Sequence, residues 1–247
     1  EGGYDMVERE RPAALITGGA KRIGKAIVIE LAQKGYDIAL HYNYSLEEAQ
    51  KLQKGVRSLG VECELFQTNF ENPKETTKLI DQVIEVFPNL EILINNASIY
   101  ESGSFLDYDM DRLERHFLIN FKTPYILTRD FAIRLKTGHV INITDTKINQ
   151  LAVEYFGYTL SKKTLYDFTR MAAKELAPHI RVNGICPGPI LPPKTSEPGY
   201  MEKRSESVPL KRTGNPELIS GTVWFLIENT FITGECIHVD GGEHLIN

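Results

Sequence analysis

Short apolar runs alternate with longer segments of helical periodicity along the chain, and this rhythm limits the possible folds more than any other feature. The expected strands cover residues 13–17, 36–42, 61–67, 91–95, 139–143, 181–185 and 235–239. The expected helices cover residues 22–34, 45–59, 73–87, 109–119, 121–135, 158–177 and 216–228. Strands that are joined through helices pair in parallel by right-handed crossovers. The pattern therefore predicts a single-domain α/β protein with one doubly wound parallel sheet of the Rossmann type, about seven strands and helices on both faces.

Local signals set the ends of several elements and mark one long loop. Ser45 with Glu48 three residues later, and Asn72 before a proline, are typical of helix starts, and Gly138 is typical of a helix end. Residues 187–210 contain six prolines, which is too many breakers for a regular element. Loops of this length are usually functional, so we expect this one to cover a substrate.

Composition and charge exclude several classes of protein. Hydrophobic residues make up 42% of the 247 and charged residues 25%, which is typical of a soluble globular chain. The net charge is −5 and the basic residues are scattered, so we expect no nucleic-acid partner. We expect a cytoplasmic protein with no membrane partner, because no apolar run is long enough to span a bilayer and the N-terminus does not resemble a signal peptide. The dispersed histidines predict no metal site, and we expect reduced, buried thiols at Cys63, Cys186 and Cys236.

A glycine-bearing turn joins the first expected strand to the first expected helix. Gly18, Gly19 and Gly24 stand where a positive φ, a close approach to phosphate or close helix packing would need glycine. In a doubly wound sheet the pyrophosphate of a dinucleotide binds at this place. The turn therefore predicts a dinucleotide site, and we expect Asn95 and Asn96, at the end of the fourth strand, to line its adenosine side.

The end of the second strand indicates which nicotinamide cofactor binds. An acid there would accept hydrogen bonds from the adenosine ribose and would repel a 2′-phosphate. The chain instead places donors and no acid here, with two cations in the neighbouring turn. These residues are His41, Tyr42, Asn43 and Ser45, with Lys21 and Arg22. We therefore predict NADP(H) as the cofactor.

Tyr158 and Lys162 carry the expected proton chemistry. Four residues apart on a helix, they share a face, so the phenol and the ammonium can project into one pocket. A nearby cation favours the phenolate and lowers the pKa of tyrosine from its usual value near ~10. The pair is therefore predicted to transfer a proton near neutral pH.

Five ordered motifs resemble those of the short-chain dehydrogenase/reductase family, over essentially the whole chain from Pro12 onward. They are Thr17-Gly18 with Gly24, Asn95-Asn96-Ala97, Asn120, Tyr158-x-x-x-Lys162 and Pro187-Gly188. The resemblance implies hydride transfer to or from a nicotinamide cofactor, with Tyr158 as proton donor or acceptor. It implies that Lys162 holds the nicotinamide ribose and depresses the pKa of Tyr158, and that Asn120 supports a water-linked proton path. We expect an N-terminal extension at residues 1–11 and a dinucleotide-binding catalytic domain at 12–247, with a substrate loop at 187–210.

Two departures from the usual family pattern narrow the resemblance. Arg22 replaces a usual glycine, and Asp145 replaces the usual catalytic serine. With aromatic Tyr100 and with Asn149-Gln150, they make the chain similar to pteridine reductases and bacterial dihydromonapterin or dihydrofolate reductases. The resemblance implies a pterin ring between the nicotinamide and Tyr100, and an Asp145 that orients or protonates Tyr158 or helps to shuttle its proton.

The motifs and the resemblance together imply three sets of site residues. The catalytic set is Asp145, Tyr158 and Lys162. The cofactor-binding set is Gly18, Lys21, Arg22, Ile23, His41, Tyr42, Asn43, Ser45, Asn69, Phe70, Asn95, Ala97, Ser98, Asn120, Thr144, Tyr158, Lys162, Pro187, Gly188 and Ile190. The substrate-binding set is Arg22, Ser98, Tyr100, Asp145 and Tyr158.

Alternatives to a pterin reductase stay open from the sequence. A carbonyl reductase acting on acyl-thioester, sugar or steroid ketones is the first, and a dinucleotide-binding protein without turnover is the second. Asn69 stands where the family usually has an acid that touches adenine, so its contribution is open as well. The family commonly assembles as tetramers, which makes a homotetramer the expected assembly.

Overall fold

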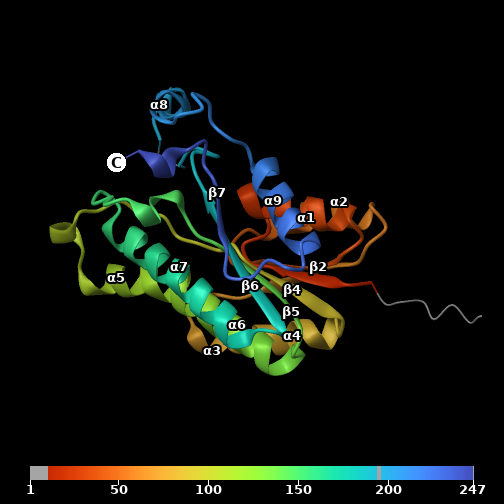
Figure 1. The fold of residues 1–247 in the computed structure, drawn as a ribbon. Coiled ribbons are helices and arrows are strands. Elements are labelled where there is room, and N and C mark those ends of the chain that lie inside the picture. The colour runs from red at the N-terminus through yellow and green to blue at the C-terminus, as the bar shows by residue number, and fades with distance from the viewer. Residues whose placement is uncertain (1–10, 194–195, 247) are drawn as a thin grey trace, which may run out of the picture.

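Seven parallel strands form one sheet in the order β3-β2-β1-β4-β5-β6-β7 (Figure 1). The strands are β1 Ala13–Ile16, β2 Asp37–Tyr42, β3 Cys63–Gln67, β4 Leu90–Asn95, β5 Gly138–Ile143, β6 Ile180–Pro187 and β7 Cys236–Val239. This computed structural model describes residues 11–193 and 196–246, so the expected extension at 1–11 lies outside the described residues except for Arg11. The predicted Rossmann-type sheet is confirmed.

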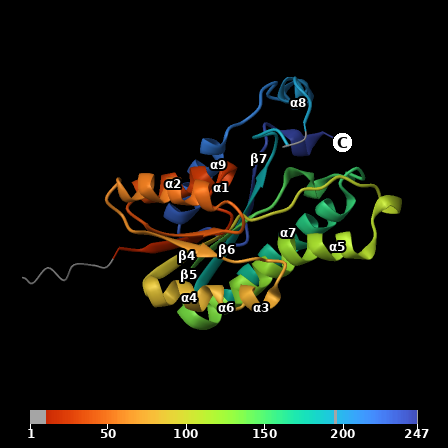
Figure 2. The same cartoon turned by 180° about the vertical axis from the view of Figure 1, so that it is seen from behind.

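Helices cover both faces of the sheet, as the crossovers require (Figures 1 and 2). The layer on one face contains α1 Arg22–Gln33, α2 Leu46–Arg57 and α9 Pro216–Glu228. The layer on the other contains α3 Pro73–Thr76, α4 Leu79–Val86, α5 Met110–Phe117, α6 Thr123–Leu135 and α7 Phe156–Leu176. Because strand side chains alternate between faces, Ala14 and Ile16 of β1 join the core under α1, while Ala13 and Leu15 join the core under α6.

Two predicted helix boundaries need correction. The helix expected at 73–87 is two helices, α3 and α4, because the backbone amide of Lys78 bonds to the Glu75 carbonyl, three residues back, and the regular i to i−4 pattern stops there. Gly138 does not end α6. The left-handed cap is Lys136, with φ of 59°, and Gly138 begins β5.

The helices expected at 109–119 and 121–135 are joined without a loop. A π-helical segment, Leu118–Lys122, connects α5 to α6. Such segments occur frequently at functional sites, and this one carries Asn120.

The substrate loop at 187–210 also differs from expectation, because it contains α8 Tyr200–Ser207. The prolines are confined to the two ends of the loop, and the stretch between Gly199 and Pro209 has neither proline nor glycine. Gly199, with φ of 80°, precedes the helix. The loop therefore carries a structured element that lies apart from the sheet (Figure 1).

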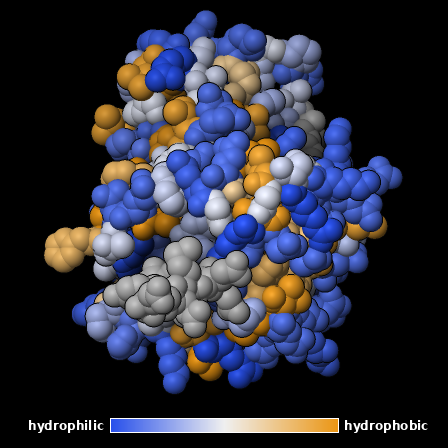
Figure 3. Space-filling model, turned by 90° about the vertical axis from the view of Figure 1, so that its right-hand side faces the viewer, coloured by the Kyte–Doolittle hydropathy of each residue, from blue (hydrophilic) through white to orange (hydrophobic). Residues whose placement is uncertain are grey.

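The surface carries no sign of a bilayer-spanning element within the described ranges: no helix there is long and apolar enough to cross a membrane. On one face, apolar side chains occur in separate groups between hydrophilic ones (Figure 3). Cys63, Cys186 and Cys236 are buried and free. Residues 11–193 and 196–246 hold no group of three or more histidine, cysteine or acidic side chains that suits a metal ion.

Candidate active site

The carboxyl ends of β1, β4, β5 and β6 bring most of the predicted site residues to one edge of the sheet. The chain runs outward from β1 through β2 to β3 and then crosses back to place β4 on the other side of β1, so the direction of strand addition reverses at β1. A doubly wound sheet binds its ligand at this switch point. The site is therefore built around the segments that follow these four strands.

The glycine turn after β1 is fixed to the end of β4 by side-chain hydrogen bonds. Thr17 Oγ1 accepts from the backbone amides of Asn96, at 2.9 Å, and Ala97, at 3.0 Å. Asn96 Nδ2 donates to the carbonyls of Thr17, at 2.9 Å, and Gly18, at 3.1 Å. A Cβ at Gly24 would lie 2.3 Å from the Gly18 carbonyl oxygen, so the start of α1 packs directly on the turn. The turn is pre-organised at a helix N-terminus, where anions bind favourably.

His41 supports this turn and has no hydrogen bond left for a phosphate. The backbone amide of Gly18 donates to His41 Nδ1 at 3.0 Å, and Nε2 lies 3.1 Å from the carbonyl oxygen of Thr68. The ring is 2% exposed and stacks on Phe70 at 4.2 Å. Burial lowers the pKa of His41 to about 4, so it is neutral. The expectation that His41 contacts the cofactor directly is therefore corrected to a role in holding the turn.

The predicted 2′-phosphate pocket contains a carboxylate that the sequence interpretation left out. Glu48, on the first turn of α2, forms an ion pair with Lys21 at 2.5 Å, and the two side chains are 49% and 41% exposed. Asn43 Nδ2 donates to Asn69 Oδ1 at 3.3 Å. Ser45 precedes α2 as expected but makes no side-chain cap bond. At the predicted 2′-phosphate site, the carboxylate of Glu48 therefore occupies the ammonium of Lys21.

Asn95 is not in the cofactor crevice. Its side chain is buried, and Nδ2 donates to Asn142 Oδ1 at 2.8 Å and Thr128 Oγ1 at 3.4 Å. Neighbouring residues of a strand point to opposite faces, so Asn95 enters the core while Asn96 reaches the glycine turn. The Asn95 side chain is therefore used within the core, and Asn96 is the amide that bonds to the glycine turn.

The catalytic set meets at the N-terminal part of α7. The hydroxyl of Tyr158 donates to Asp145 Oδ2 at 2.6 Å, and Asp145 Oδ1 accepts from the backbone amide of Lys147 at 2.7 Å. Lys162 Nζ donates to the carbonyl of Ile143 at 2.7 Å and lies 5.9 Å from the centre of the Tyr158 ring. Asp145 therefore acts both as a cap and as the direct partner of the phenol.

The acid–base balance of this group differs from the sequence prediction. Burial raises the pKa of Tyr158 well above its usual value, and the charge and hydrogen bond of Asp145 raise it further. Burial lowers the pKa of Lys162 to about 8, although Asp145 opposes this shift. The lysine does not depress the tyrosine pKa here, because the carboxylate is in direct contact with the phenol and the ammonium is not. Tyr158 therefore keeps its proton at neutral pH.

Asn120 joins the catalytic helix to the segment after β4. Its Oδ1 accepts from the amide of Ile99, at 2.9 Å, and from the hydroxyl of Ser98, at 3.0 Å. Its Nδ2 donates to the Ile99 carbonyl and to Ser161 Oγ, both at 3.1 Å. Ser161 in turn donates to the carbonyl of Tyr158 at 2.7 Å. Asn120 thus connects to the Tyr158 backbone through Ser161, and the hydroxyl of Ser98 is bonded to it.

An aromatic wall borders the phenol, and part of it was missed from the sequence. Tyr100 stacks on Tyr155 at 4.3 Å and meets the ring of Tyr158 edge-on at 4.6 Å. The ammonium of Lys147 lies 4.8 Å from the Tyr155 ring and 3.5 Å from the Tyr100 hydroxyl. Tyr155 stands three residues before Tyr158, and that helical spacing could have indicated it.

The segment after β6 closes the other side of the site. A Cβ at Gly188 would lie 2.6 Å from the Cα of Asp240, so glycine permits this close approach. Ile190 is buried, and Thr144 Oγ1 donates to the Ile185 carbonyl at 2.8 Å. Arg22, with φ of 55°, donates to the Pro192 carbonyl at 2.9 Å. Arg22 therefore ties the glycine turn to the substrate loop.

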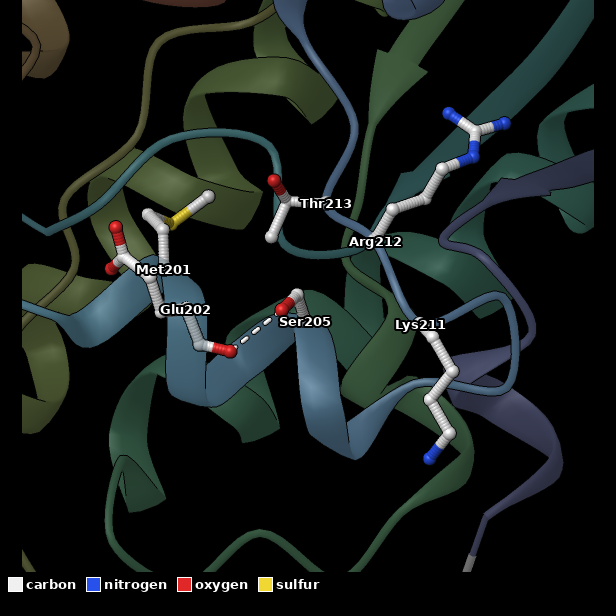
Figure 4. Close-up of a pocket in the computed structure, with 6 residues that line it drawn as sticks. All are labelled: Met201, Glu202, Ser205, Lys211, Arg212 and Thr213. Atoms are coloured by element: carbon white, nitrogen blue, oxygen red, sulfur yellow. Dashed lines mark hydrogen bonds between the residues drawn. The ribbon is translucent and has the colours of Figure 1, made fainter.

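A second tie holds α8. Arg204 forms an ion pair with Glu243, whose side chain is 7% exposed, and the Glu243 carbonyl accepts from Gln150 Nε2 at 3.1 Å. A cavity of about 300 Å³ lies between α8 and the segment that follows it (Figure 4). Its lining residues are Met201, Glu202, Ser205, Lys211, Arg212 and Thr213. None of them is among the predicted catalytic, cofactor-binding or substrate-binding residues, although the first three lie in the predicted substrate loop.

Comparisons with known proteins agree with this architecture. Residues 18–244 match a family described as Enoyl-(Acyl carrier protein) reductase. FolM alternative dihydrofolate reductase 1 from Brucella suis, solved in complex with NADP, has 38% identity and a TM-score of 0.91, with 96% of each chain covered. The 3-oxoacyl-[acyl-carrier-protein] reductase FabG of Staphylococcus epidermidis is 29% identical, covering 94% of this chain and 99% of its own. NADPH-dependent aldehyde reductase 1 of Arabidopsis thaliana is 33% identical, covering 93% and 85%.

Proposed function

Because this chain belongs to the short-chain dehydrogenase/reductase family, we propose that it is an NADPH-dependent reductase of pterins and dihydropterins, of the dihydromonapterin, dihydrofolate or biopterin type. The observation that carries the proposal is the 2.6 Å hydrogen bond between Tyr158 and Asp145 beside an aromatic wall. The resemblance to FolM, a dihydrofolate reductase by name that was solved with NADP, supports both the substrate class and the cofactor.

The chain's own residues fit the proposed cofactor. NADP(H) supplies a hydride when it is bound. The turn at Gly18 and Gly24 offers a fixed backbone at the N-terminus of α1, which suits a pyrophosphate. Lys21 and Asn43 would hold the 2′-phosphate, and Lys162 with Asn120 would position the nicotinamide side. The Lys21–Glu48 pair is exposed, and such pairs are weak, so a phosphate can replace the carboxylate.

Tyr158 is suited to donate a proton in a reduction. Its pKa is raised by burial and by Asp145, so the phenol is protonated before the reaction. Reduction of a C=N bond needs a proton at nitrogen, and the phenol is the group we assign to this step. Lys162, 5.9 Å from the ring, stabilises the phenolate by its charge after donation.

Asp145 and the aromatic wall favour a nitrogen heterocycle over a ketone. A carboxylate only accepts hydrogen bonds, so it can bind ring N–H and amino groups, whereas the usual serine can donate to a carbonyl oxygen. Tyr100 offers a flat ring beside Tyr158, at 4.6 Å, for a planar substrate. Ser98 and Arg22 are proposed to reach its polar edge.

A substrate panel with NADPH tests this function. Oxidation of NADPH would be followed with biopterin, dihydrobiopterin, dihydromonapterin, dihydrofolate and a ketone. We expect turnover with dihydropterins, and a fall in kcat of about 10²–10⁴-fold in Tyr158→Phe, because the proton donor is lost. Failure of the wild-type protein on every pterin, or full activity in Tyr158→Phe, would end the proposal.

Carbonyl reduction is the second candidate, because the FabG relative is named as a reductase of 3-oxoacyl-[acyl-carrier-protein]. The residues Tyr158 and Lys162 serve that reaction equally well. A ketone or acyl thioester turned over faster than any pterin in the same panel would select it.

The assembly is proposed to be a homotetramer in the cytoplasm. α6 and α7 carry apolar side chains at the surface, among them Tyr125, 44% exposed, and Met171, 71% exposed. Tyr125 packs on Phe168 across the two helices, at 5.5 Å between ring centres. This surface suits a second copy of the chain, and the mass in solution tests it.

A further inference from the structure

His116 is a fully buried histidine next to the catalytic group, and the mechanism above does not use it. It lies in the last turn of α5, four residues before Asn120, and is 0% exposed. Its ring centre is 6.5 Å from that of Tyr158, in an edge-on arrangement. Burying an imidazole without hydrogen-bond partners is costly, so its contacts indicate its role.

The two ring nitrogens of His116 have different partners. Nδ1 lies 3.4 Å from Asn120 Nδ2, which can only donate, so Nδ1 is the acceptor. The proton is therefore on Nε2, which lies 3.1 Å from the hydroxyl of Tyr108. That hydroxyl donates to the carbonyl of Glu101 at 3.0 Å. The result is one consistent chain of hydrogen bonds from the Asn120 amide to the segment after β4.

Tyr108 is held in place by two glycines. A Cβ at Gly103 or at Gly157 would lie 2.5 Å from an atom of the Tyr108 ring. Gly157 is the second residue of α7, one position before Tyr158, and Gly103 accepts and donates backbone bonds beside Tyr155. The ring of Tyr108 therefore fits between the start of the catalytic helix and the segment that carries Tyr100.

Burial is the main cause that keeps His116 neutral. Burial lowers its pKa; Glu101 opposes this shift, while Arg115 and Arg112 reinforce it. Glu101 Oε2 is 3.8 Å from Nε2, but Glu101 is already paired with Arg115 at 2.5 Å. Arg115 also pairs with Glu71 at 2.6 Å. A neutral ring keeps Nδ1 free to accept from Asn120.

We propose that His116 is a positioning residue, which holds the Asn120 amide in the orientation that supports Ser161 and Tyr158 during proton transfer. The proposal rests on the proposed function only in assigning the proton to Tyr158. Asn120 has two amide hydrogens and three acceptors within 3.4 Å, namely the Ile99 carbonyl, Ser161 Oγ and His116 Nδ1. An acceptor on the third side limits rotation of this amide, and Tyr108 fixes the acceptor in turn.

Three variants test this role. His116→Leu removes the acceptor, His116→Asn restores an oxygen near the Nδ1 position, and Tyr108→Phe removes the partner of Nε2. We expect kcat to fall on the order of tenfold in His116→Leu, with KM for NADPH changed less than about twofold, because a misplaced group costs rate more than binding. His116→Asn should recover most of this loss, and Tyr108→Phe should lose part of it.

A matched control separates positioning from stability. His139 is also buried, at 3% exposed, but lies on β5 with Arg181 and Asn183 as partners. His139→Asn should lower the unfolding midpoint without lowering kcat at a temperature where it is folded. Wild-type kcat in folded His116→Leu, or an equal loss in the asparagine and leucine variants, would overturn the proposal. If the wild-type protein reduces no pterin, the proposed function fails separately, and the same variants are compared on the ketone that it reduces.

Discussion

The glycine turn and the substrate loop hold two sides of one site by different means. The turn is fixed by several partly buried hydrogen bonds, which involve the side chains of Thr17, Asn96 and His41. The loop has backbone bonds at its two ends, and between them two single side chains tie it to the rest of the site, Arg22 on the Pro192 carbonyl and Arg204 on Glu243. The glycine turn, on the cofactor side, is thus held by several hydrogen bonds. The loop, on the substrate side, depends more on individual side-chain contacts, and a single substitution can remove one of them.

Acid should weaken the glycine turn through His41, which tests the first side of the comparison. The pKa of His41 falls from 6.5 to about 4 on folding, so below pH 6.5 the unfolded chain takes up a proton that the folded chain refuses. Stability should therefore fall as the pH drops, by roughly 3 kcal/mol over that window. Denaturant unfolding at a series of pH values measures the slope.

The pKa of His139 is also lowered, to about 3, so His139 contributes to the pH dependence of stability in the same direction. Two variants therefore separate the contribution of His41. His41→Gln should flatten the pH dependence by the share that belongs to His41. His179→Gln, at an exposed position away from the turn, is the control variant. An identical slope in His41→Gln and the wild type would contradict the assignment.

A methyl group at Gly24 tests the rigidity of the turn directly. Its Cβ would meet the Gly18 carbonyl at 2.3 Å, and overpacking of this kind costs about 1–3 kcal/mol. We expect Gly24→Ala to lose stability and NADPH affinity together, as measured by unfolding and by fluorescence titration. Gly55, inside α2, has open space around it, so Gly55→Ala should instead add about 0.5–1 kcal/mol. Equal effects of the two substitutions would show that the turn is not closely packed.

The same contrast explains what could be predicted from the sequence. The parallel sheet and the glycine turn follow from periodicity and from motifs whose spacing is local, whereas the pairing of Asp145 with Tyr158 was implied by the family resemblance. The role of His41 could not be read, because it depends on Thr68 and Phe70, which reach it only through the pairing of β2 with β3. Asn95 and Asn96 were treated alike, although one-residue alternation sends their side chains to opposite faces.

Residues that enter the site from distant segments were the ones missed. Glu48 reaches Lys21 from α2, and Glu243 reaches Arg204 from near the C-terminus. Helix α8 was not predicted, because the prolines at both ends of the loop indicated an irregular segment throughout. Ion pairs between residues far apart in the sequence produce no periodic pattern from which they could be predicted.

Loss of the Arg204–Glu243 ion pair should weaken substrate binding more than cofactor binding. Arg204→Met leaves the Glu243 carboxylate buried without its cation, which is unfavourable. We expect KM for the dihydropterin to rise severalfold while KM for NADPH is unchanged, as measured by steady-state kinetics. Lys203→Met, at an exposed neighbouring position of α8, is the control. Addition of Glu243→Gln should relieve the unpaired charge and restore part of the effect; a rise in both KM values would argue against a substrate-side role.

The smallest effect is expected at the exposed rim of the rigid side. Glu48 competes with a 2′-phosphate for Lys21, but both side chains are nearly half exposed, so water and salt screen the pair. Glu48→Gln should therefore tighten NADPH binding by only a few fold, leave NADH binding unchanged, and lose its effect at high salt. Glu47→Gln, at the preceding exposed position of α2, is the matched control for net charge. An equal gain for NADH, or for Glu47→Gln, would mean that the acid acts through the general field of the protein rather than on the phosphate. A loss of NADPH affinity would mean that Glu48 positions Lys21 for the phosphate. The ion pair would then belong to the pre-organised cofactor site, together with the glycine turn.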